Sequence, residues 1–287
     1  MLKGQMKNLL QIAALTLLPI QGLSAQQPIF DTHVHLWNGE VSIRAYEDQL
    51  KDAKVEITSF AGMWFGGPNQ AQSGRLDIIR KGNDSVLALS ARNPKVVPVV
   101  TVHPYDGLAA LTELQRVASR GAKVLKIHPH TQKFDAADPR VLTLVRHAGE
   151  LEMVVLMDNA NILPGDSEKL FNLALLAPNT KFIFAHMGGL NFRFWNMLKL
   201  ARTAENLFAN NIYFDISAIV TLAADSPLEE EFVWTMRNVG IDQLLLGSDF
   251  PQLSLPQALA ALDKLGLSED EKSLIRYDNA KGLLGLP

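Results

Sequence analysis

Short apolar runs and longer amphipathic stretches alternate along most of this chain. The apolar runs are rich in Val, Ile, Leu and Phe, which is typical of strands that are buried on both faces of a parallel sheet. Eight of them are predicted as strands, over residues 29–35, 54–62, 96–103, 122–128, 153–159, 181–187, 212–217 and 243–249.

Helical spacing of apolar residues follows many of these runs. The clearest helices are predicted over residues 108–121, 138–152, 226–240 and 268–285. Pro139 stands at a first-turn position, where a missing N–H costs no hydrogen bond. Ser226 with Glu229 and Ser268 with Glu271 have the spacing of capping boxes, in which two side chains cap the first turn reciprocally.

Eight strands, each followed by a helix or a long loop, predict an α/β fold of the (β/α)8 barrel type. A doubly wound open sheet is the alternative, and the strand count favours the barrel. The sequence contains no internal repeat and no linker rich in Pro, Gly or Ser. We therefore expect a single barrel domain over residues 27–287.

The first 25 residues have a different pattern. Lys3 and Lys7 precede an apolar run over residues 9–20, and small and polar residues follow as far as Ala25. This order predicts a secretory signal peptide over residues 1–25, and hence a periplasmic or secreted protein. An uncleaved anchor and an amphipathic helix are the alternatives, but the apolar run is short for a membrane span.

Composition narrows the classes of partner. The chain has 287 residues, of which 47% are hydrophobic and 20% charged, with a formal net charge of -3. Its scattered basic residues give no reason to expect a nucleic acid partner, so we expect a small molecule instead. Because the chain has no cysteine, a metal site would have to use His, Asp, Glu or Lys.

His33 and His35 are the first candidates for such a site. Residues two apart on a strand point the same way, with Cα atoms roughly 6.5 Å apart. Two imidazoles at this spacing can hold one metal ion at roughly 2.1 Å each. Two hydrogen-bonded histidines without a metal are the alternative.

Most of the other polar candidates also stand at the ends of predicted strands. In a barrel these ends converge on one mouth, where active sites lie. The candidates are Asp31, His103, Lys126, His128, Asp158, Asn159, His186, Asp215, Ser217, Ser248 and Asp249. Imidazoles and carboxylates at one mouth suit a divalent ion such as Zn, Mn or Fe.

Five segments resemble the amidohydrolase superfamily. They are "DTHVHLW", "KIHP", "FAHMGG", "LLLGSDFP" and "NAKGLLGL", in this order and spread over residues 29–286. The most similar branch is that of the amidohydrolase-related metal-dependent hydrolases, which also contains aminocarboxymuconate-semialdehyde decarboxylase. The resemblance implies a barrel and one divalent ion, with Zn expected first and Mn or Fe as alternatives.

The resemblance also implies roles for single residues. His33 and His35 match strand-one metal ligands, and Asp249 matches the strand-eight aspartate that binds metal and transfers protons. His186 matches a histidine that polarises substrate or water. Asp158 stands where the family has a strand-five histidine; a substitute metal ligand is the preferred interpretation, and a site with fewer protein ligands or a degenerate site are the alternatives.

Four residues are candidates for substrate contacts: Lys126, His128, Trp37 and Arg193. An ion pair of Lys126 with Asp31, Asp215 or substrate is the preferred role, because buried charges are usually paired. His103 and His128 each precede a proline, so capping of a strand end is an equal alternative for both. Packing of loops on the barrel is the alternative for the aromatic side chains.

The expected activity is hydrolysis of an amide, lactone or other ester bond of a small organic molecule. Asp249 would accept a proton from a metal-activated water, and His186 would stabilise the oxyanion. A metal-dependent, non-oxidative decarboxylase is the first alternative, with Arg193 holding a substrate carboxylate. A degenerate exported binding protein is the second. Self-association stays open.

Overall fold

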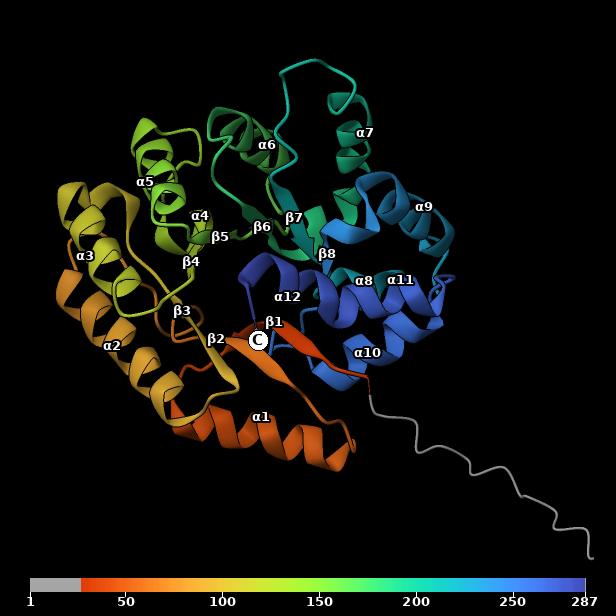
Figure 1. Cartoon of the computed structure of the whole chain (residues 1–287), viewed down its shortest axis with the longest axis horizontal. Coiled ribbons are helices and arrows are strands. Elements are labelled where there is room, and N and C mark those ends of the chain that lie inside the picture. Colours follow the sequence, from red (N-terminus) through yellow and green to blue (C-terminus); the bar gives the residue numbers. More distant parts are fainter. Residues whose placement is uncertain (1–26, 287) are drawn as a thin grey trace, which may run out of the picture.

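A computed structural model describes residues 27–286, so the predicted leader over residues 1–25 lies outside the described residues. Eight parallel strands are hydrogen-bonded in chain order from β1 to β8. They stand inside a ring of helices (Figure 1), which confirms the barrel prediction. The strands are β1 Phe30–His35, β2 Ser59–Met63, β3 Val96–Val100, β4 Val124–Ile127, β5 Val154–Met157, β6 Phe182–Phe184, β7 Ile212–Asp215 and β8 Leu244–Leu245.

The segment after β8 closes the barrel against β1. The His35 N–H donates to the Phe250 carbonyl at 2.8 Å, and the Asp249 N–H donates to the His33 carbonyl at 2.9 Å. These bonds run between the two segments that carry the strand-one histidines and the strand-eight aspartate. Closure of the barrel therefore places these three side chains together.

The helices pack around the outside of the barrel. The α-helices are α1 Glu40–Asp52, α2 Leu76–Arg92, α3 Leu108–Ala118, α4 Pro129–Gln132, α5 Pro139–Glu150, α6 Asp166–Leu176, α7 Met197–Ala201, α8 Ile219–Ala223, α9 Glu229–Val239, α10 Leu255–Lys264, α11 Glu269–Ser273 and α12 Asn279–Leu284. The 3-10 segments are η1 Pro104–Asp106, η2 Ala185–Asn196 and η3 Ile241–Gln243, and η4 Leu274–Asp278 is a π-helix.

Two of the predicted helix starts are confirmed. The Asp138 carboxylate accepts a hydrogen bond from the Arg140 N–H at 2.9 Å, with Pro139 in the first turn of α5. Ser268 and Glu271 form the reciprocal capping box of α11. Such a cap satisfies N–H groups that have no partner within the helix, and it is typically worth about 1 kcal/mol.

Two other helix predictions need correction. Helix α9 begins at Glu229 rather than Ser226 because the Ser226 hydroxyl accepts from the Leu228 N–H in a turn before the helix. The Glu229 carboxylate meanwhile accepts from the Asp225 N–H, so no capping box forms there. The predicted helix over residues 268–285 is interrupted by η4 between α11 and α12.

The core has two parts, one between the strands and the helices and one inside the barrel. The inner part is closed at one end by Ala280, Leu283 and Leu284 of α12. Its strand residues are Phe30, Ala61, Met63, Val99, Val124, Val154, Leu156, Ile183 and Leu245. A packed interior directs ligands to the loops at the carboxyl ends of the strands, as in other barrels of this type.

Strand β1 has a local irregularity that matters for the site. Its pairing with β2 shifts register between Asp31 and Val34. Phe30 belongs to the inner core and Val34 to the outer core, so His33 and His35 point inward like Phe30 despite their odd spacing from it. Bulges of this kind often redirect side chains beside active sites.

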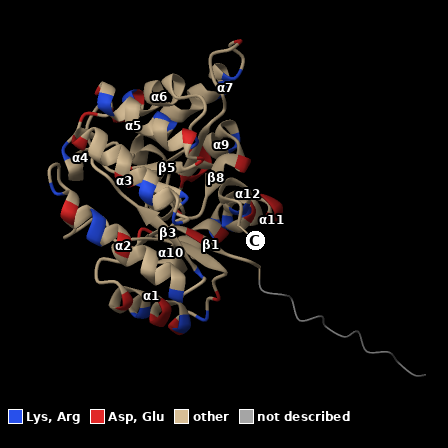
Figure 2. Cartoon of the chain, turned by 60° about the vertical axis from the view of Figure 1, so that its left-hand side comes forward, with Lys and Arg blue, Asp and Glu red and all other residues tan. Residues whose placement is uncertain are grey.

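The outer surface carries both signs of charge. Lys and Arg positions are interspersed with Asp and Glu positions on the outer helices, for example along α1 (Figure 2). Among residues 27–286 no helix is long and apolar enough to cross a membrane.

Candidate metal and active site

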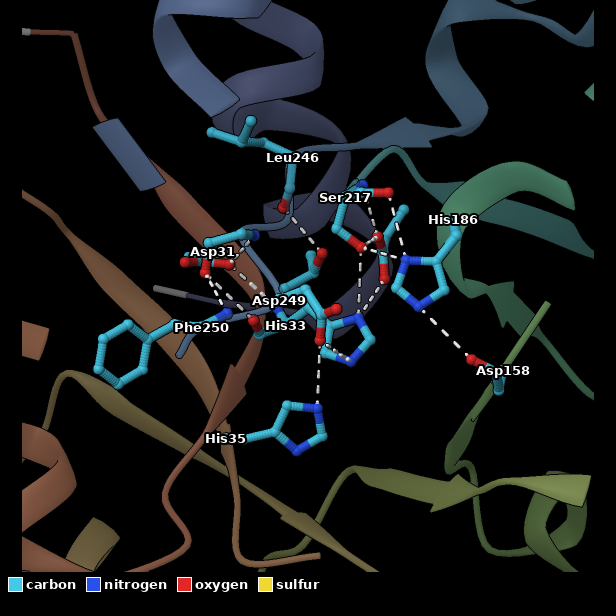
Figure 3. A network of polar contacts seen from close by, with 12 residues as sticks. Asp31, His33, His35, Asp158, His186, Ser217, Leu246, Asp249 and Phe250 are labelled. Atoms are coloured by element: carbon cyan, nitrogen blue, oxygen red, sulfur yellow. Dashed lines mark hydrogen bonds and ion pairs between the residues drawn. The ribbon is translucent and has the colours of Figure 1, made fainter. Parts of the chain in front are cut away.

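Three predicted metal ligands come together at the mouth of the barrel. The Asp249 carboxylate oxygen lies 3.3 Å from His35 Nε2 and 3.5 Å from His33 Nε2. The donor atoms of the three residues all lie within 4.8 Å of one another, and all three side chains are buried. Figure 3 shows Asp249 between the two imidazoles. Two imidazole nitrogens and one carboxylate at this spacing can hold a divalent ion.

The other ring nitrogen of each histidine has a partner that fixes the ring. His33 Nδ1 lies 2.8 Å from Asp215 Oδ2, and His35 Nδ1 lies 2.7 Å from the Phe65 carbonyl. Each Nδ1 can therefore carry the proton, which leaves the Nε2 lone pair free toward the centre. A Cβ on Gly66 would stand 2.6 Å from the His35 ring, so the loop after β2 needs a glycine to approach His35 this closely.

The electrostatics of the three side chains suit a cation. Burial, followed by the charge of Lys126, lowers the pKa of His33 to about 4, so its imidazole is neutral at pH 7. Burial raises the pKa of Asp249, but the neighbouring His33 and His35 outweigh it and hold the pKa below its usual range. A neutral His33 imidazole beside an ionised Asp249 carboxylate fits a divalent metal in the state that coordination requires.

Two residues of the site have a strained backbone. Asp249 and His186 have left-handed backbone angles, with φ of 60° and 62°, and Met187 follows with φ of 47°. Residues other than glycine adopt this region at a cost, and such strain clusters at functional sites.

A second group of polar residues lies on the β4–β6 side of the mouth. Asp158 Oδ1 lies 3.4 Å from His186 Nε2 and 3.7 Å from His128 Nε2. Figure 3 shows the Asp158 carboxylate pointing toward His186. Asp158 is absent from the sets of donor atoms close enough to share an ion, among residues 27–286. In this geometry it is a partner of His186 and His128, and its predicted role as a metal ligand stays a prediction.

His186 is held between two kinds of acceptor. Its Nδ1 lies 2.9 Å from the Ser217 hydroxyl and 3.2 Å from the Ser217 carbonyl, and Nε2 faces Asp158. Burial lowers the pKa of His186, but the Asp158 hydrogen bond and the charge of Asp215 outweigh it and raise the pKa to about 9. His186 is therefore protonated at pH 7.

Lys126 is a buried cation at the same mouth. Its side chain continues the inward series of Val124 on β4, and only 2% of the residue is exposed. Within the described residues its ammonium has no ion-pair partner closer than 4.0 Å, so the predicted pair with Asp31 or Asp215 does not form. Burial lowers the pKa of Lys126, and the charges of Asp158, Asp215 and Asp249 oppose that shift.

These groups line a cavity of about 320 Å³ at the carboxyl ends of the strands. Its walls include His33, His35, Asp249, Asp158, His186, Lys126, His128, Trp37, Gln70 and Gln252. A second cavity of about 610 Å³ lies outside it and shares His128, Asp158, His186, Asp249 and Gln252. The structure thus brings all the residues predicted to bind metal, to react or to contact substrate to one hollow except Arg193.

Arg193 faces away from this cavity. Its Nε lies 2.6 Å from Glu231 of α9, and it lines neither of the two cavities. The backbone turns of residues 186–189 in η2 change the direction of the chain before Arg193, which the sequence alone does not indicate.

The two histidines before prolines have structural contacts. His103 accepts from the Tyr105 N–H and bonds the Gln132 carbonyl at 2.7 Å, so it caps η1. His128 caps α4 through Nδ1, while its Nε2 faces the cavity. His128 therefore combines the two alternatives that the sequence left open.

Asp215 and Asp31, which the sequence suggested as partners of Lys126, instead hold other parts of the site together. Asp215 orients His33 and also accepts from the Ser217 hydroxyl. Asp31 Oδ1 accepts from the N–H groups of His33 and Ser248, at 3.1 and 2.8 Å. Both carboxylates stood on predicted strands, but only the closed barrel shows which side chain each one contacts.

Comparison with known proteins now identifies the family. An amidohydrolase family model matches residues 30–286, so the chain belongs to this family, as the sequence motifs predicted. No curated protein sequence matches the chain significantly.

Solved structures with the same fold are distant in sequence. An amidohydrolase candidate from Staphylococcus aureus has a TM-score of 0.70 and 20% identity, covering 91% of this chain and 99% of its own. The 5-carboxyvanillate decarboxylase from Sphingomonas paucimobilis has a TM-score of 0.69 and 15% identity, covering 92% and 100%. A dihydroxybenzoic acid decarboxylase from Polaromonas, with bound manganese and 2-nitroresorcinol, has a TM-score of 0.62 and 15% identity, covering 91% and 97%.

Proposed function

We propose that this protein is a metal-dependent, non-oxidative decarboxylase of a small hydroxylated carboxylic acid. One observation carries the proposal: Lys126 Nζ, which has no ion-pair partner within 4.0 Å among residues 27–286, lines the same cavity as the three metal-ligand candidates. A buried cation without a partner is costly, and a substrate carboxylate would supply the missing charge. Two of the similar structures are decarboxylases of aromatic acids, which makes this reaction the first to test.

The proposed metal centre consists of His33, His35 and Asp249. When bound there, a divalent ion such as Mn or Zn supplies positive charge that stabilises developing negative charge on the substrate. Manganese in one similar decarboxylase supports testing Mn beside the expected Zn.

The chain itself would position the acid and supply a proton. Lys126 binds an oxygen of the substrate carboxylate from the β4 side of the cavity. When the bond to the carboxyl carbon breaks, CO2 leaves and its electron pair stays on the substrate carbon. His186, kept protonated beside Asp158, then donates a proton to that carbon, and solvent restores the proton.

Hydrolysis is the second candidate, and it rests on a different pair of groups. Asp249 and His186 line the same cavity, so one can accept a proton from an attacking water and the other can stabilise an oxyanion. A lactone or another ester would then be the substrate.

A comparison of reactions separates these candidates. The purified protein, loaded with Mn or Zn, would be assayed for CO2 release from 5-carboxyvanillate and from dihydroxybenzoic acids, and for opening of the lactone dihydrocoumarin. Metal-dependent CO2 release that falls at least tenfold in Lys126→Met, but not in the exposed control Lys181→Met, supports the proposal. Metal-dependent lactone opening without CO2 release would replace it by hydrolysis.

Absence of both activities together with absence of bound metal would favour the binding-protein alternative. The leader-like residues 1–25 support an exported location, which cell fractionation tests independently of the reaction.

A further inference from the structure

Exposed apolar side chains gather beside the candidate active site. Ile162, Leu190 and Leu222 are 76%, 62% and 57% exposed, and all three line the outer cavity. We refer to these three residues as the apolar rim. Single exposed apolar side chains are common on proteins, but several around one hollow mark a binding surface.

The apolar rim is built by three separate loops or helices. Ile162 follows β5, Leu190 lies in η2 after β6, and Leu222 lies in α8 after β7. A Cβ on Gly189 would stand 2.4 Å from the Ala160 carbonyl, so the glycine lets the loops that carry Leu190 and Ile162 pack together. This close approach brings two of the three rim residues side by side, and Leu222 lines the same outer cavity.

The outer cavity is continuous with the inner one. Both are lined by His128, Asp158, His186, Asp249 and Gln252, so a molecule whose polar end lies in the inner cavity can extend into the outer one. The inner cavity of about 320 Å³ has charged walls. The apolar rim lines only the outer cavity. A substrate that matches both parts has a charged head and an apolar tail.

We propose that Ile162, Leu190 and Leu222 bind an apolar substituent of the substrate, so that the preferred substrates are acids with an alkyl or aryl extension. This inference rests on the proposed function for the position of the acid group. It adds a class of substrate that neither the metal centre nor Lys126 requires. The rim then determines specificity, while the inner cavity determines the reaction.

Binding of two matched ligands tests the inference without any turnover. Benzoate and 4-butylbenzoate share the same head, and calorimetry of the purified protein gives the Kd of each. Each fully buried CH2 is worth about 0.8 kcal/mol, or roughly fourfold in affinity. Because the rim covers only one side of the tail, we expect 4-butylbenzoate to bind about tenfold more tightly than benzoate.

Substitutions test whether the apolar rim causes the tighter binding of 4-butylbenzoate. In Leu222→Ser we expect most of the gain to disappear while the Kd of benzoate changes less than about twofold. Leu200→Ser is the matched control, because Leu200 is 73% exposed but does not line either cavity; it should keep the full gain. An equal gain in Leu222→Ser, no gain in the wild-type protein, or no binding of either ligand at millimolar concentration would overturn the inference.

Two further results separate the rim from the reaction and from self-association. If Lys126→Met leaves the Kd of benzoate unchanged, the proposed position of the acid is wrong, yet a gain that Leu222→Ser removes would still support the rim. If light scattering shows a dimer that Leu222→Ser dissociates, with the gain unchanged, a second copy of the chain occupies the rim and the inference fails.

Discussion

The two sides of the barrel mouth differ in how firmly their side chains are held. On the β1–β8 side, the His33 and His35 rings are fixed by bonds of 2.8 and 2.7 Å to Asp215 and the Phe65 carbonyl, and the Asp249 N–H donates to the His33 carbonyl at 2.9 Å. On the β4–β6 side, His186 is bonded to the Ser217 hydroxyl at 2.9 Å, but the Asp158 carboxylate contacts His186 and His128 at 3.4 and 3.7 Å, and Lys126 has no ion-pair partner within 4.0 Å among residues 27–286. Rigidly held donors suit a permanently bound metal ion. Polar groups with fewer close partners suit a substrate that binds and dissociates.

This difference implies a division of roles. Variants on the β1–β8 side should change metal binding, and variants on the β4–β6 side should change turnover with the metal retained. Metal content and turnover therefore separate the two sides of the mouth.

The largest effect is expected from His35→Ala. Removal of one of three closely spaced donors leaves two ligands, which hold a divalent ion poorly. Elemental mass spectrometry should give about one ion per wild-type chain and almost none per variant chain. His147→Ala is the control, because His147 lies in α5 beside Glu150 and away from the cavity. Full metal content in His35→Ala would show that the ion is held elsewhere.

The next effect is expected from Asp158→Asn. The variant keeps the size of the side chain but removes the charge beside His186, so proton transfer should slow by about 10²- to 10⁴-fold. Metal content should stay at the wild-type level, because Asp158 is outside the group formed by His33, His35 and Asp249. Loss of the ion would instead establish Asp158 as the substitute ligand that the sequence predicted.

A smaller effect is expected from Asp215→Asn. Asp215 contacts the His33 ring at Nδ1, the nitrogen that faces away from the proposed metal centre. Asp215 orients His33 through Nδ1, and loss of such a partner typically weakens metal binding by about 10- to 100-fold. Competition with a chelator would measure this change. A variant with unchanged metal affinity would mean that the bulged strand alone fixes the His33 ring.

The same comparison shows where prediction from sequence succeeded. All eight strands and the barrel could be predicted because apolar runs and helical periodicity are local signals. The clustering of His33, His35 and Asp249 could be predicted because strand ends converge and the motifs are short. In both cases the information lies within a few consecutive residues.

The remaining parts depend on contacts between distant segments. The register shift at Asp31 places Phe30 and His33 on the same face, which simple alternation does not predict. The pairing of Arg193 with Glu231 depends on the turns of η2. Lys126 was expected to pair with Asp31, Asp215 or substrate because buried charges are usually paired. Among residues 27–286 it has no carboxylate within 4.0 Å, which leaves the substrate.

The smallest effect concerns Tyr46, which supports the β1–β8 side from outside the barrel. Its hydroxyl donates to Asp31 Oδ2 at 2.8 Å, while Asp31 Oδ1 holds the N–H groups of His33 and Ser248. Tyr46→Phe removes one hydrogen bond to a buried carboxylate, so we expect a loss of about 1 to 3 kcal/mol in the free energy of unfolding, measured by urea denaturation. The backbone bonds of Asp31 stay in place, so metal content should hardly change. A large loss of metal without a loss of stability would mean that Tyr46 positions the ligands directly, and that the rigidity of this side extends to helix α1.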